Sequence, residues 1–117
     1  MSSSADYSPV VQDDLSASIA ISTAQSATID LKGTQLCGLH MPSAFSGSSV
    51  KIMASPDGVA TFNPVQSAGA DFVLTVAASK YVPIENLALI AGLRFIQIQS
   101  NATEAAARTI TLATRPL

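Results

Sequence analysis

Apolar and polar residues alternate in short stretches along this chain, a period typical of β-strands that bury one side chain and expose the next. Seven stretches show this alternation clearly, and two segments, at 60–62 and 80–84, show it more weakly. Together they predict about eight short strands. The clearer stretches are 18–24, 27–31, 34–41, 50–54, 72–76, 93–100 and 108–115.

Turn residues separate these stretches. Gly33, the SPDG sequence at 55–58 and the GAD sequence at 69–71 each supply residues that accept the backbone angles of tight turns. Pro83 cannot donate a backbone hydrogen bond, so the segment 80–84 is expected at a sheet edge. Residues 85–91 are expected to form a helical turn that ends at Gly92.

The stretch from Leu93 to Arg115 has the pattern of an antiparallel hairpin, with two alternating segments around a short loop. Its outward side is uncharged and needs either water or a neighbouring molecule to cover it. The inward side is predicted to hold Ile96, Ile98, Ile110 and Leu112, and the outward side Gln97, Gln99, Thr109 and Thr111.

The third predicted strand, 34–41, has apolar residues at both odd and even positions. Cys37, Leu39 and Met41 share one face and Leu36 lies on the face of His40, so this strand is expected to be apolar in part on both faces. Eight short strands in one small chain favour an all-β fold with antiparallel pairing, a β-sandwich or jelly roll. We assign 1–17 to an extended N-terminal arm and 18–117 to a single β-sandwich domain.

Composition argues for a surface that neighbours cover. Charged residues make up 12% of the chain, whereas about 25% is usual. The net charge is −2 and no basic stripe appears, which argues against nucleic-acid binding. Ser, Thr and Ala fill the place of the missing charges. The alternative is a free monomer with a Ser/Thr-rich β surface.

The residues that carry chemistry are few. His40 is the only histidine and Cys37 the only cysteine, so there is neither an intramolecular disulfide nor a Cys/His zinc set. Three positions apart on one strand, they point to opposite faces and cannot act as nucleophile and base. We therefore expect no enzyme activity, and no metal or other cofactor.

The chain also shows no sign of a membrane or secretory route. No apolar run approaches the ~18 residues that span a membrane, and the N-terminal residues lack the pattern of a signal peptide. Asn101, Ala102 and Thr103 match the glycosylation triplet, but without a secretory signal this match carries little weight. We expect a protein that is made in the cytoplasm and is neither secreted nor membrane-bound.

Three segments of the sequence carry a resemblance to known proteins: VKIMASPDGVATFNPV, DFVLTVAASKYVPI and GLRFIQIQSNATEAAARTITLATRP. A strand that ends in S-x-D-G is followed by a T-V-x-A segment, and an L-R-F-I-x-I strand by an A-A-x-R-x-I-x-L strand. Over Val50–Pro116 the chain thereby resembles small β-sandwich virion structural proteins of tailed bacteriophages.

The resemblance implies a capsid decoration, or cement, protein on the capsid surface of the virion. Its implied partners are the major capsid protein and copies of itself, as a dimer or trimer. The alternative is a neck, tail or fibre accessory protein that binds a host glycan, for which exposed aromatic residues would be needed.

Apolar residues in otherwise polar segments are the candidates for partner contacts. The predicted contact residues are Tyr7, Pro9, Val10 and Val11 in the arm, and Met41, Phe45 and Tyr81 in the domain.

Overall fold

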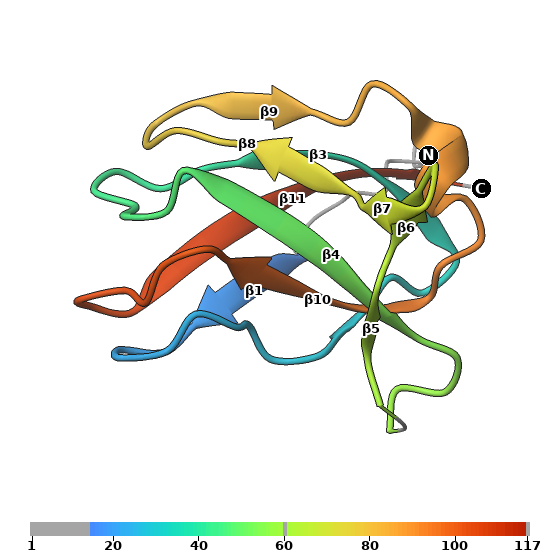
Figure 1. Ribbon diagram of the computed structural model, residues 1–117, viewed down its shortest axis with the longest axis horizontal. Coiled ribbons are helices and arrows are strands. Elements are labelled where there is room, and N and C mark those ends of the chain that lie inside the picture. The colour runs from blue at the N-terminus through green and yellow to red at the C-terminus, as the bar shows by residue number, and fades with distance from the viewer. Residues whose placement is uncertain (1–14, 60, 117) are drawn as a thin grey trace, which may run out of the picture.

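The computed structural model describes residues 15–59 and 61–116 (Figure 1). Within them the chain forms short strands and one 3-10 helix, η1 (Leu87–Ile90), and no α-helix. The strands are β1 (Ser16–Ile19), β2 (Ile29–Asp30), β3 (Thr34–His40), β4 (Ser49–Ser55), β5 (Asn63–Pro64), β6 (Gln66–Ser67), β7 (Ala70–Asp71), β8 (Val73–Thr75), β9 (Tyr81–Pro83), β10 (Phe95–Ser100) and β11 (Arg108–Pro116).

All strand pairs are antiparallel, so the predicted all-β class and antiparallel pairing are confirmed. A four-stranded sheet has the order β1-β11-β3-β9, and a five-stranded sheet has the order β2-β10-β4-β5, with β8 also paired to β4. Strands β6 and β7 form a separate small hairpin. Its loop, Ala68 and Gly69, has two positive φ angles, as the tightest hairpin turns require.

Both larger sheets contribute to one hydrophobic core. The four-stranded sheet buries Ile19, Leu39 and Ile110, and the five-stranded sheet buries Ile52 and Ile98. Alternation explains this division, because the residues on either side of each buried position point away from the core. Each sheet therefore has a core side and an outer side.

The predicted C-terminal hairpin is wrong. Strand β10 pairs with β2 and β4, whereas β11 pairs with β1 and β3, so the two strands belong to different sheets. The loop 101–107 crosses from one sheet to the other (Figure 1). The predicted inward residues are nevertheless confirmed, since all four are buried.

The prediction that strand 34–41 is apolar in part on both faces is wrong, because β3 contains a bulge. Opposite Ala113 and Thr114, the partner residue on β3 jumps from Gly38 to Leu36, and Cys37 is passed over. One inserted residue shifts the alternation, so Leu36 and Leu39 are both buried in the core, at 2% and 0% exposure. Cys37 itself is half-buried.

The N-terminal strand is shorter and begins earlier than its pattern predicts. Strand β1 starts at Ser16, inside the predicted arm, and ends at Ile19. The chain then turns through Ser22, which has a φ of +66°, and Ile21, inside the predicted strand 18–24, is 60% exposed. The strand predicted at 60–62 is also displaced along the chain: the structure has it at Asn63–Pro64.

Candidate functional site on the uncharged sheet faces

The outer side of the four-stranded sheet is uncharged except for Arg115 near the end of β11, which donates a hydrogen bond to Gln35, and we call its uncharged part the hydroxyl face. Strand register aligns Ser16, Thr111, His40 and Tyr81 in one row across all four strands, and all four are exposed. The hydroxyl face consists of Ser16, Ser18, Gly38, His40, Tyr81, Pro83, Thr109 and Thr111.

An aromatic pair stands at the β9 end of this row. The ring centroids of His40 and Tyr81 are 4.6 Å apart, with their planes tilted by 40°. The Tyr81 ring lies over Gly38, where an added Cβ would be 2.4 Å from the tyrosine Oη. Glycine is therefore what allows the ring to lie across the sheet, and the tyrosine remains 47% exposed.

The outer side of the five-stranded sheet is almost as free of charge, and we call it the amide face. Gln97 accepts a hydrogen bond from Gln25 and donates one to Thr28, so side chains of the β1–β2 connection extend this surface. Two charged residues lie on this side: Lys51, which pairs with Asp71 at 2.9 Å, and Asp30, which stands opposite Phe95 on the edge strand β2. The amide face consists of Lys51, Met53, Val73, Thr75, Gln97 and Gln99.

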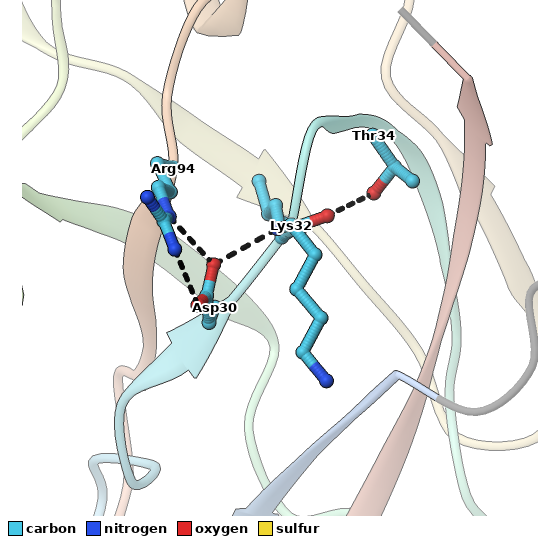
Figure 2. Close-up of polar contacts among 5 residues, drawn as sticks. Asp30, Lys32, Thr34 and Arg94 are labelled. Atoms are coloured by element: carbon cyan, nitrogen blue, oxygen red, sulfur yellow. Dashed lines mark hydrogen bonds and ion pairs between the residues drawn. The ribbon is translucent and has the colours of Figure 1, made fainter.

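The other charged residue on the strands of this sheet, Asp30, is also paired. Figure 2 shows its carboxylate facing the Arg94 guanidinium, with Nε 3.0 Å from Oδ1 and Nη2 3.1 Å from Oδ2. The backbone N–H of Lys32 donates to Oδ1 at 2.9 Å. Chiefly through the Arg94 hydrogen bonds, these contacts hold the pKa of Asp30 below its ordinary value of 3.8. The group is a structural clip that joins the end of β2 to the residue before β10 and, through the Lys32 N–H, to the β2–β3 turn.

Glu104 is a buried carboxylate that the sequence pattern did not reveal. It lies in the crossing loop, is 1% exposed, and accepts hydrogen bonds at Oε1 from the Ser46 backbone N–H (2.9 Å) and from Arg108 Nε (3.1 Å). Its own backbone bonds to Thr23 and Ser22. Glu104 thus joins three loops at one end of the molecule. The available signal was the Glu–Arg spacing of four residues.

Asn101 has a structural role that its glycosylation triplet does not suggest. Its Oδ1 accepts the backbone N–H of Ser48 at 3.0 Å, and its Nδ2 donates to the Ser48 Oγ at 2.9 Å. It lies beside a shallow depression of about 250 Å³, also lined by Ser49, Lys51 and Gln99. The asparagine amide therefore fixes the β3–β4 loop against the crossing loop.

The predicted contact residues differ in their exposure in the structure. Tyr81 is exposed, and its pairing with His40 adds a neighbour that the sequence did not predict. Met41 and Phe45 belong to the core, so their prediction as partner contacts is corrected: their side chains are already covered by this chain. The predicted arm contacts, Tyr7, Pro9, Val10 and Val11, lie outside the described residues.

Side chains that commonly act as nucleophiles, bases or metal ligands are few in residues 15–59 and 61–116, and Cys37 and His40 have different neighbours. Cys37 directs its thiol at the Gln35 carbonyl oxygen, at 3.5 Å, while His40 contacts Tyr81. Across residues 15–59 and 61–116, no group of three or more His, Cys, Asp or Glu side chains could hold a metal ion. Nor does that part of the chain contain a helix of sufficient length and apolarity to cross a membrane.

Comparison with known proteins gives no match: no family model, curated protein or solved structure matches this chain.

Proposed function

We propose that this protein is a non-enzymatic structural protein of a virion, a decoration or cement protein that stabilises a phage head by bridging capsid subunits. Its two larger sheets would form a β-sandwich of the jelly-roll kind. Its partners would be the major capsid protein and copies of itself, as dimers or trimers on the capsid surface. The resemblance of Val50–Pro116 to phage virion proteins supports the class of protein.

The amide face is the observation that carries this proposal. A free protein usually keeps charge on its outer surface for solubility. Here the centre of a half-buried sheet face holds amide, hydroxyl and apolar groups, and the charge of Lys51 is paired with Asp71. Such a surface can pack against a neighbouring subunit without burying an unpaired charge, which is the costly event at interfaces.

The hydroxyl face gives the molecule a second uncharged surface. Because both sheets contribute to one core, the protein would be able to meet neighbours on the outer sides of both. Each contact adds area that must be separated before the shell ruptures. Contacts that are weak singly act together when they are repeated over a shell.

A charge placed on the amide face tests the proposal. Gln99→Lys should reduce the number of copies per phage head and lower the temperature at which the heads rupture, because an unpaired charge would have to be buried. Copy number is measured by quantitative gel analysis of purified heads, and rupture by DNA release on heating.

Ala91→Lys is the matched control, since it adds the same charge at an exposed position after η1, away from both faces. It should leave occupancy unchanged. Equal occupancy for Gln99→Lys and the wild type would contradict the role of the amide face. In the same assay, deletion of residues 1–12 tests the arm contact, and unchanged occupancy would count against it.

A further inference from the structure

We propose that the His40–Tyr81 end of the hydroxyl face binds a neutral oligosaccharide, in addition to the structural role. The Tyr81 ring lies across the sheet over Gly38 and keeps about half of its surface open. An aromatic face carries partial negative charge and attracts the slightly positive C–H groups on one side of a sugar ring. Tyr81 therefore supplies the platform on which such a ring can stack.

Polar groups continue in line from this platform. The exposed residues His40, Thr111 and Ser16 follow Tyr81 across the sheet in one register row. Imidazole and hydroxyl groups both donate and accept hydrogen bonds, as sugar hydroxyls do. A linear oligosaccharide that runs across the strands would meet one such group per strand.

Charge on the surrounding residues favours a neutral ligand. The two charged residues on the strands of this sheet stand at the ends of β11: Arg108 pairs with Glu104, and Arg115 bonds to Gln35. Lys80 precedes β9 and is not a member of the face. Neither a sulfated nor a sialylated sugar would find an opposed charge within the row.

The size of the face argues against a second copy as its occupant. Four strands about 4.8 Å apart and three outward positions about 6.8 Å apart give roughly 400 Å² per copy. Two such faces would bury about 800 Å², whereas stable interfaces bury about 1,200–2,000 Å². A small ligand can bind without burying an area of this size.

The test uses the chain's single histidine as its reporter. Proton NMR of the His40 ring is followed in the full-length protein while maltohexaose or hexa-N-acetylchitohexaose is added. We expect a saturable shift with at least one of these neutral probes. Tyr81→Ala should raise the half-saturating concentration at least tenfold, and Tyr81→Phe should leave it within about twofold, since the ring is retained.

Two further variants sharpen the result. Gly38→Ala displaces the tyrosine ring while keeping it in the protein, so it should weaken binding as well. Thr75→Ala, on the amide face, should not.

No saturable shift with either probe would overturn the proposal. So would a His40 shift that follows protein concentration without sugar, because it would identify self-association. Loss of head occupancy in Tyr81→Ala without sugar binding would identify a protein contact instead. None of these three outcomes depends on the Gln99→Lys result, so the two proposals fail separately.

Discussion

A single buried carboxylate organises the loops at one end of the molecule. Glu104 bonds through Oε1 to Ser46 and Arg108, while Oε2 is buried without a hydrogen-bond partner among the described residues. Arg108 is largely buried beside it. Burying a charged pair costs solvation, and each member depends on the other to offset that cost.

Glu104→Ala should therefore lower the free energy of unfolding by about 3 kcal/mol, because it leaves the Arg108 charge buried without a partner. Urea unfolding followed by circular dichroism measures the change. Glu85→Ala, at an exposed position, is the control and should stay within about 0.5 kcal/mol. If adding Arg108→Ala recovers none of the loss, the ion pair is not its cause.

At the scale of elements, the Asp30–Arg94 clip makes the junction between β2 and β10 sensitive to acid. The pKa of Asp30 is lower in the folded protein than its ordinary value of 3.8, chiefly because Arg94 donates to the ionised form. The stabilisation is therefore complete above this ordinary value and is lost as pH falls through the lower folded-state pKa. The pair is partly exposed, so solvent and salt weaken it.

Asp30→Asn should destabilise the protein at pH 7, and its deficit relative to the wild type should shrink as pH falls below about 4. Urea midpoints of both proteins over this pH range give the comparison. A deficit that stays constant with pH would show that the carboxylate charge does not matter to the clip.

Alternation predicted most strands but not their partners. The inward residues of β10 and β11 follow from local sequence, because the side chain's direction depends only on position within a strand. Whether the two strands pair depends on the path of the crossing loop. Glu104 and Asn101 of this loop accept hydrogen bonds from Ser46 and Ser48, which are far away in the sequence. The bulge at Cys37 and the burial of Met41 and Phe45 are likewise set by tertiary packing.

The candidate site was predictable only in part. Exposed Tyr81 and the uncharged outward residues Gln97, Gln99, Thr109 and Thr111 could be read from the pattern. The register row that brings Ser16, from the other end of the chain, level with Tyr81 could not, because register is set between strands far apart in sequence.

For the whole molecule, the distribution of charge is the main functional clue. Charged side chains gather in loops, at strand ends and in ion pairs, while the centres of both outer faces are neutral. A molecule with this arrangement can be covered on two sides. The proposed cement role needs coverage of the amide face, whereas the proposed sugar site needs the Tyr81 end of the hydroxyl face to stay open.

The most direct test of the cement role is a cryo-electron microscopy map of the phage heads, at a resolution that places individual strands. We expect copies of this protein arrayed on the capsid surface, with Gln97 and Gln99 of the amide face against a neighbouring subunit. Heads without the protein, or arrayed copies whose amide face is open to solvent, would contradict it.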